Sequence, residues 1–276
     1  MATGCDRRHR DTGRDRAGRG THARVGRWAY AVAQRWVPRD ERSWDASPVD
    51  DDISPRRAAQ TLGITWVLIL LGVLAVGWVL THPLQSTVDP WDNSVNRWFE
   101  DHRTSGLDVA ADIGSKVADT IIGLALALVL AIVVSRKVRS WRPAIYYAVL
   151  VGPTLALYLI VTALVPRDRP PVKILDPGLV PDHSFPSGHV FTSIVVYCAT
   201  ALLLNAYFPR WRSWTWLLFL VPLVVAPSRL YQGAHHPTDV MTSLLFAPIW
   251  VAVVAHVLLP EPAAREDDRS PDMVGA

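Results

Sequence analysis

Three short polar segments, far apart in the chain, carry residue types that together could transfer a phosphoryl group. They are Arg167-Asp168-Arg169-Pro170, Pro186-Ser187-Gly188-His189, and Ser228-Arg229 followed by His235 and Asp239. Between them they supply two imidazoles, a carboxylate close to one of them, and several guanidiniums. A histidine nucleophile with cations to stabilise the phosphoryl oxygens is what phosphoryl transfer through a covalent intermediate requires.

The third segment places a histidine four residues before an acid at the start of a predicted helix. Pro237 suits the first turn of a helix, so His235 should precede that turn and Asp239 should lie within it. The carboxylate would then reach one imidazole nitrogen, fix the tautomer and leave the other nitrogen as the nucleophile. The alternative is an ordinary turn in which Asp239 is a favourable charge at a helix start.

The second segment combines a helix cap with a candidate proton donor. Ser187 suits an N-cap, and Gly188 lets a backbone N–H approach a ligand closely. A helix N-terminus attracts anions, and His189 at that place can donate a proton to a leaving-group oxygen. The alternative is a capped helix start with an interfacial histidine, because Pro-Ser-Gly is common in turns.

Three arginines accompany these histidines. Arg167, Arg169 and Arg229 can each hold two phosphoryl oxygens through a forked guanidinium. For one arginine at the end of an apolar run, snorkelling towards the membrane surface is the simpler interpretation. Three of them beside two histidines favour an anion site. The acids, histidines and cysteines of the sequence do not have metal-ligand spacing, so we expect no metal and no other cofactor.

Apolar runs determine the fold class. Of the 276 residues, 50% are hydrophobic, and several runs exceed the roughly 18 to 20 residues needed to cross a bilayer. Because lipid does not tolerate an unpaired backbone, each run is predicted to be helical. We expect an all-α polytopic membrane protein with a six-helix transmembrane bundle, whose spans lie at residues 61–82, 117–135, 143–165, 189–207, 213–230 and 238–259.

The remaining segments are polar or amphipathic. Segment 86–116 has apolar residues at helical spacing among acids and bases, which predicts one or two interfacial helices between the first and second spans. Residues 1–57 are Arg-rich and poor in apolar residues, so we expect a disordered tail. The transmembrane domain is assigned to residues 58–260, and residues 261–276 form a short acidic tail. The basic tail also contains Asp and few regularly spaced aromatics, so no nucleic-acid partner is expected.

Positive charge between the spans predicts their orientation. With six spans, three basic groups fall on one side, which makes that side and both termini cytoplasmic: Arg56 and Arg57, Arg136 to Arg142, and Arg210 with Arg212. The third and fifth spans end, and the fourth and sixth begin, beside the three polar segments. All four ends are therefore predicted to meet at the outer face of the cell membrane, where they would assemble one site.

These motifs resemble the type 2 phosphatidic acid phosphatase superfamily, which also contains vanadium haloperoxidases. The family pattern is Lys, six residues, Arg-Pro; then Pro-Ser-Gly-His; then Ser-Arg, five residues, His, three residues, Asp. The second and third parts are matched in full, and the first is matched only by Arg169-Pro170. Thr162 stands where the pattern has Lys, and we expect Arg167 to supply the missing charge.

The resemblance implies a metal-independent phosphatase mechanism. In it His235 attacks phosphorus and forms a phosphohistidine, and Asp239 orients His235. His189 protonates the leaving oxygen and then activates water. The phosphoryl oxygens are bound by Arg169, Arg229, Ser187 and the Gly188 amide.

A site between helix ends at a membrane surface suits a lipid phosphate that arrives by lateral diffusion in the bilayer. The expected substrates are phosphatidate, phosphatidylglycerol phosphate or undecaprenyl pyrophosphate. Two alternatives remain open at this point. One is a lipid phosphotransferase that uses the same residues, and the other is a catalytically weak phospholipid-binding membrane protein, for which Thr162 is the sequence argument.

Overall fold

The computed structural model describes residues 54–176, 179 and 183–260. The tails predicted from the sequence therefore lie outside the described residues, with one exception. Residues 55–57, which the sequence assigned to the N-terminal tail, already belong to the first helix. That helix begins at Pro55 because Ser54 caps it, its hydroxyl accepting a hydrogen bond from the Arg57 amide.

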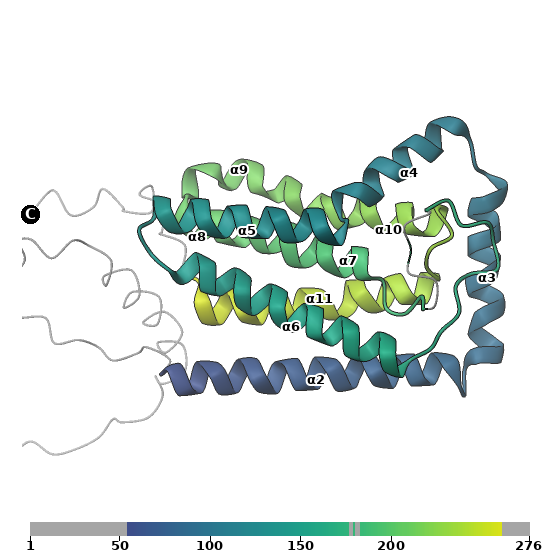
Figure 1. The fold of residues 1–276 in the computed structure, drawn as a ribbon, viewed down its shortest axis with the longest axis horizontal. Helices are drawn as coiled ribbons and strands as arrows, with labels where there is room; N and C mark the ends of the chain where they lie inside the picture. Colours follow the sequence, from purple (N-terminus) through teal and green to yellow (C-terminus); the bar gives the residue numbers. More distant parts are fainter. Residues whose placement is uncertain (1–53, 177–178, 180–182, 261–276) are drawn as a thin grey trace, which may run out of the picture. The chain divides into compact units, whose positions relative to one another are not determined.

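Six helical stretches in the described part of the chain are long and apolar enough to cross a membrane, which confirms the predicted all-α, multi-pass architecture. Figure 1 shows them side by side. Four of the six are α2 (Pro55–Thr81), α5 (Thr120–Lys137), α6 (Arg142–Leu164) and α11 (Pro237–Leu258). The fourth span joins α7 (Gly188–Ser193), η2 (Ile194–Cys198) and α8 (Ala199–Tyr207). The fifth joins η3 (Pro209–Trp211), α9 (Arg212–Thr215), η4 (Trp216–Leu220) and α10 (Val221–Tyr231).

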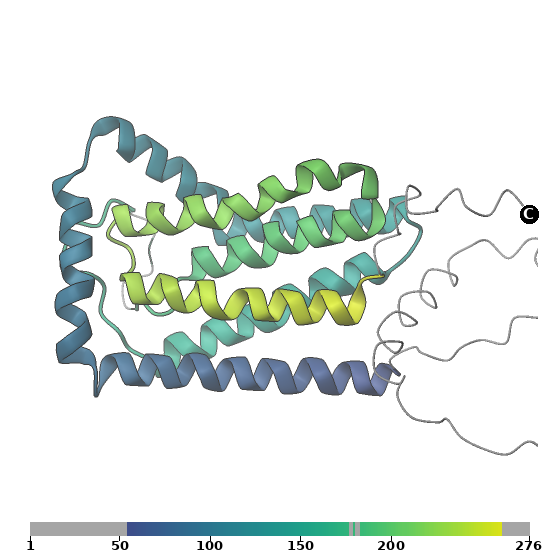
Figure 2. The ribbon, with the colours of Figure 1, turned by 180° about the vertical axis from the view of Figure 1, so that it is seen from behind.

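The fourth span is the most enclosed of the six. Of its most apolar window, 61% is buried within the protein, against 17% for α2. The outer helices expose large apolar side chains such as Leu68 and Leu71, which suits contact with lipid. Seen from behind, α2 lies alongside α11 (Figure 2). Gly72 permits this close approach, because a Cβ there would lie 2.7 Å from the Phe246 ring.

Two further helices, α3 (Gln85–Asp101) and α4 (Ser105–Val117), fill the segment predicted to be interfacial. Helix α3 runs across one end of the bundle, at the right-hand edge of Figure 1. Its outward face exposes Trp91 and Trp98, whereas Asp92 and Asn96 are fully buried. Helix α3 therefore turns its polar face towards the rest of the protein. An ordinary amphipathic surface helix turns its apolar face inwards instead.

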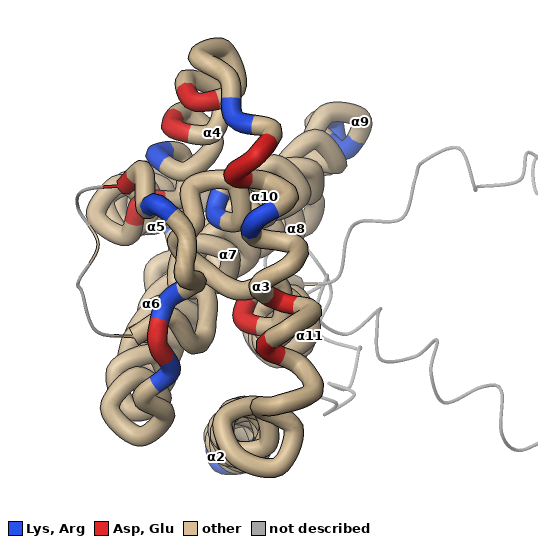
Figure 3. Tube along the Cα trace, turned by 90° about the vertical axis from the view of Figure 1, so that its right-hand side faces the viewer, with Lys and Arg blue, Asp and Glu red and all other residues tan. Residues whose placement is uncertain are grey.

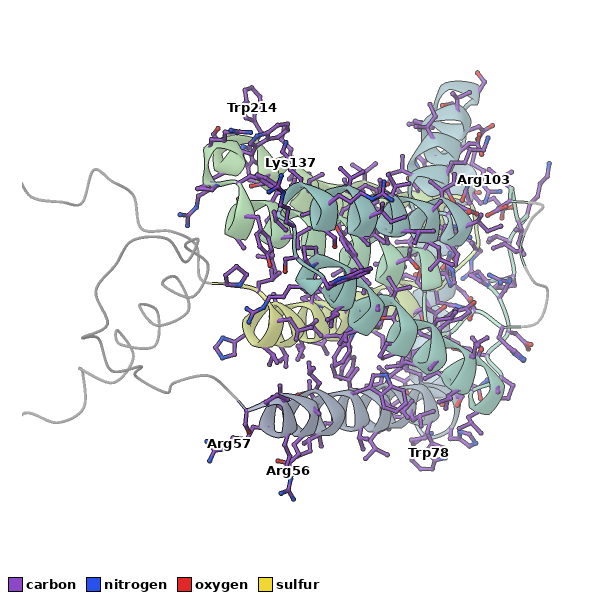
Figure 4. All side chains as sticks on the ribbon, turned by 60° about the vertical axis from the view of Figure 1, so that its left-hand side comes forward. Arg56, Arg57, Trp78, Arg103, Lys137 and Trp214 are labelled. Carbon is purple, nitrogen blue, oxygen red and sulfur yellow. The ribbon has the colours of Figure 1, made fainter. Side chains whose placement is uncertain are left out.

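The two ends of the bundle differ in their side chains. Figure 4 places Arg56, Arg57 and Lys137 at one end, and Trp78 and Arg103 at the other. The end that carries Arg103 is the one where α6 and α10 stop and α7 and α11 start. Figure 3 views the protein from this end, where acidic and basic positions gather on α3 and on the connecting loops. The predicted meeting of four helix ends is thus observed.

Candidate active site

His235 lies in the short connection between α10 and α11 and is 3% exposed. Its Nδ1 lies 2.5 Å from the backbone carbonyl oxygen of Ser184. A carbonyl can only accept, so Nδ1 carries the proton and Nε2 is left with a lone pair. Burial, reinforced by the positive charges of Arg229 and Arg169, holds the pKa of His235 well below its ordinary value. The imidazole is therefore neutral near pH 7, the state that a nucleophile needs.

Ser184, which anchors that ring, is itself fixed to the first polar segment. Its amide donates to the carbonyl of Arg167 at 2.8 Å, and its hydroxyl donates to the carbonyl of Asp168 at 2.9 Å. Between Ser184 and the start of α7, the Phe185–Pro186 peptide bond is cis. The orientation of the His235 ring therefore depends on a loop that precedes it by about fifty residues in sequence.

Asp239 does not make the predicted hydrogen bond to His235. Its Oδ2 is 3.9 Å from His235 Nδ1 and instead accepts from the backbone N–H of His236 at 2.8 Å. The reason is local: an acid in the first turn of α11 folds back to the amide that begins the helix. Asp239 thus holds the backbone next to His235, and the carbonyl of Ser184 holds the ring.

Arg167 also departs from the prediction. It is 5% exposed, and its Nη1 donates to Asp239 Oδ1 at 2.6 Å while its Nη2 donates to Asp92 at 2.7 Å and to Asp89 at 3.2 Å. Burial alone would lower the pKa of Arg167, but the carboxylates of Asp239 and Asp92 outweigh burial and raise it. Both terminal nitrogens of the Arg167 guanidinium are therefore bound to carboxylates in this structure.

Thr162 offers no charge of its own to replace that lysine. Its hydroxyl donates to the carbonyl of Tyr158, one turn earlier in α6, at 2.8 Å. Arg169 and Arg229 are the two predicted arginines whose charges act on His235. Arg169 is held next to the histidine loop, because its Nη1 donates to the carbonyl of Ala234 at 2.6 Å.

Arg229 is fully buried near the end of α10 and has two different sides. Its Nη1 donates to Asp176 at 2.8 Å, to Gln232 at 2.7 Å and to Ser115. Its Nε and Nη2 have no hydrogen-bond partner among the described residues. These two nitrogens form one edge of the guanidinium, which we call the donor edge. Nη1 fixes the direction of that edge, and the edge can grip two oxygens of one anion.

The start of α7 provides further donors. Ser187, the N-cap of α7, is fully buried, and its hydroxyl likewise has no partner among the described residues. Gly188 follows as the first helical residue and packs against Tyr158, since a Cβ there would lie 3.0 Å from the ring. Buried polar atoms without partners cost free energy, so their gathering near a neutral histidine marks a place for a polar ligand.

A cavity of about 380 Å³ opens beside these groups. Its polar lining includes His189, Gly188, Arg169 and His235, which places both predicted histidines on one cavity. The rest of the lining is mainly apolar and comes from α5, α6 and the fourth span: Ile121, Leu124, Leu155, Leu159, Val195 and Val196. Such a cavity can take a phosphoryl group with an apolar chain attached.

Several residues at the site had no signal in the sequence. Asp119 caps α5 and lines the cavity. Asp176 pairs with Arg229, and Ser184 acts through its backbone carbonyl, which any residue could supply. Spacing reveals groups that lie on one element, whereas these arrive from distant loops. Among the described residues no group of three or more His, Cys, Asp or Glu side chains is placed to hold a metal ion.

Comparison with known proteins decides the family. The PAP2 superfamily model matches residues 143–261, which include all three polar segments. The matched part of the chain is a PAP2 superfamily domain. The resemblance inferred from the motifs is thereby confirmed, and the PAP2 transmembrane fold accounts for the six spans.

Two relatives show how far the similarity extends. An undecaprenyl-diphosphatase of Sulfolobus acidocaldarius is 36% identical over 86 residues, which cover 31% of this chain and 37% of that protein. The chain thus spans little more than a third of the length of this curated relative. The crystal structure of a transmembrane PAP2 type phosphatidylglycerolphosphate phosphatase from Bacillus subtilis superposes with a TM-score of 0.60 at 20% identity, covering 70% of this chain and 94% of that one.

Proposed function

We propose that this PAP2 protein is an integral membrane phosphatase that hydrolyses a phosphomonoester or pyrophosphate of a lipid through a phosphohistidine on His235, without a metal. One observation carries the proposal. The donor edge of Arg229 and the hydroxyl of Ser187 are buried without partners in the described structure, close to a histidine kept neutral by burial and positive charge. An anionic phosphoryl group would satisfy these donors and present phosphorus to Nε2 of His235.

The reaction then follows from the positions of the side chains. Nε2 of His235 attacks phosphorus while the P–O bond to the leaving group breaks. His189, across the same cavity, donates a proton to the departing oxygen. His189 is then a base and takes a proton from water, which attacks the phosphohistidine and releases inorganic phosphate. The guanidiniums of Arg229 and Arg169 and the Gly188 amide stabilise the charge on the phosphoryl oxygens throughout.

The apolar part of the cavity supports a lipid substrate. Side chains from α5 and α6 continue the polar lining into the bundle, where a hydrocarbon chain would lie. The candidates are phosphatidate, phosphatidylglycerol phosphate and undecaprenyl pyrophosphate, and the names of the two relatives fit the last two. The basic residues at the opposite end of the bundle favour a cytoplasmic location for that end, which would place the active site at the outer leaflet.

The test is phosphate release by the detergent-purified full-length protein, measured with EDTA on those three lipids. The His235→Ala variant is assayed alongside, and its folding is checked by thermal unfolding in the same detergent. Release that persists in EDTA and disappears in the variant supports the proposal, and the preferred lipid identifies the substrate. Full activity in His235→Ala, or activity that requires a divalent metal, would overturn it.

The same residues could pass the phosphoryl group to an alcohol instead of water. A phosphotransferase would yield a new phosphoester when an acceptor alcohol is added, so analysis of the lipid products separates transfer from hydrolysis. A phospholipid-binding protein without catalysis would bind the lipid phosphate and release none. In that case Thr162→Lys is the first variant to assay, because it restores the one charge by which the chain departs from the family pattern.

A further inference from the structure

Helix α3 carries a row of polar side chains that faces the candidate active site. We call this row the polar stripe: Asp89, Asp92, Asn96, Glu100 and Arg103. The first four lie on α3, three or four residues apart, so they share one face of the helix, and Arg103 follows two residues after its end. Each of them contacts a segment that forms the site. The family match begins at residue 143, so the stripe lies outside it.

Asn96 holds the nucleophile's own backbone. Its side-chain amide donates to the carbonyl of His235 at 3.0 Å, and Asn96 is fully buried. His235 is therefore fixed from two directions, at the ring by Ser184 and at the carbonyl by Asn96. These two contacts fix His235, which lines the cavity, without using its Nε2 atom.

Asp92 holds the beginning of α11. Its Oδ1 accepts from the amide of Thr238 at 3.1 Å, and its Oδ2 accepts from the Thr238 hydroxyl at 2.6 Å. The same Oδ2 accepts from Arg167 at 2.7 Å, and Arg167 in turn binds Asp239. Asp92 thus reaches Asp239 through one intermediate residue, and Asp239 holds the amide next to His235.

The other end of the stripe holds the neighbouring loops. Glu100 accepts from the amide of Lys173 at 2.8 Å, and Arg103 donates to the carbonyl of Tyr231 at 2.9 Å. Lys173 lies in the loop that follows α6, and Tyr231 ends α10. The side chains of the polar stripe therefore make hydrogen bonds to four parts of the site: the loop after α6, the end of α10, His235 and the start of α11.

We propose that α3 is a positioning element for the phosphoryl-transfer site, with Asn96 and Asp92 as positioning residues for His235. The inference rests on the proposed function and adds residues outside the family motifs. Attack in line on phosphorus demands that Nε2 be held accurately, and a displacement of about 1 Å can cost on the order of 100-fold in rate. Neither residue needs to touch the substrate, so their loss should lower kcat and leave KM nearly unchanged.

The sharpest variant is Asn96→Asp, which keeps the shape of the side chain but replaces the donor with an acceptor facing the His235 carbonyl. We expect kcat to fall about 100-fold with KM within about threefold of the wild type. Asn96→Ala should act in the same direction, and Asp92→Asn more weakly, because it retains an acceptor for Thr238. Ser94→Ala and Asp101→Asn, on exposed positions of the same helix, are the matched controls and should behave as the wild type.

A second measurement separates positioning from loss of the fold. Orthovanadate, a trigonal-bipyramidal mimic of the phosphoryl group, should raise the melting temperature of the wild type through His235 and not that of His235→Ala. In Asn96→Asp this shift should shrink while the melting temperature without vanadate stays close to that of the controls.

The outcomes of the two measurements are distinct. Unchanged kcat and an unchanged vanadate shift in Asn96→Asp would overturn the positioning role while leaving the proposed function intact. A fall in kcat that merely follows a fall in melting temperature would also overturn it, in favour of a structural role for α3. A wild type with neither phosphate release nor a His235-dependent vanadate shift would overturn the proposed function, and this inference with it.

Discussion

Two buried arginines at the same end of the bundle have opposite surroundings. Arg167 gives both terminal nitrogens to carboxylates, those of Asp89, Asp92 and Asp239. Arg229 meets one carboxylate, Asp176, on one nitrogen, and its donor edge has no partner among the described residues. Carboxylates already neutralise Arg167, which joins the segments that carry them. Arg229 is fixed through Nη1, and its donor edge keeps two N–H groups that could bind an anion. We therefore expect the two arginines to have different roles.

The largest effect in this comparison should come from Arg229→Lys. A lysine keeps one positive charge but cannot offer two parallel N–H groups to the phosphoryl oxygens. We expect phosphate release to fall by about 100- to 1000-fold, as for the loss of one donor that stabilises a transition state. Steady-state assay of kcat/KM measures this, with Arg212→Lys in α9 as the control. A loss below tenfold would contradict the role of the donor edge.

Arg167→Met should affect stability more than substrate binding. It leaves Asp92 and Asp239 buried close together without their shared cation, which costs about 3 to 5 kcal/mol when a buried pair is broken. We expect a lower melting temperature in detergent and a KM close to that of the wild type. Arg167→Lys is the milder variant if the methionine protein does not fold. A large rise in KM with normal stability would return Arg167 to the phosphate-binding group.

A smaller effect is expected on the pH dependence. The charge of Arg169 helps to depress the pKa of His235, although burial is the larger cause. In Arg169→Gln that pKa should rise, so His235 becomes protonated, and loses its nucleophilicity, at a higher pH than in the wild type. The acidic limb of kcat/KM should therefore move to higher pH. A limb that stays in place, or moves to lower pH, would argue against this electrostatic effect.

The sequence predicted what depends on patterns within one element. Apolar runs identified the six spans, and the alternation of helix ends brought His189, Arg229 and His235 to one end of the bundle. It also identified segment 86–116 as helical. The predicted starts of the spans were displaced, at Pro55 above all, because a cap and a proline extend a helix beyond its apolar run.

The sequence could not predict how the site is held. Asp239 was expected on the His235 ring, but a carbonyl from Ser184 takes that place, and backbone carbonyls leave no trace in composition. Arg167 was expected at the phosphate because of its spacing from Arg169. In the structure its partners include Asp89 and Asp92, which lie on α3, where Asp92 is fully buried.

The most direct test of the account is to find the phosphoryl group on the protein during turnover. The full-length protein is mixed with a saturating lipid phosphate and quenched under alkaline conditions, which preserve phosphohistidine, and its peptides are mapped by mass spectrometry. We expect phosphate on His235 in the wild type during turnover and none in His235→Ala. Phosphate release without this adduct, or an adduct on His189 or His236, would contradict it.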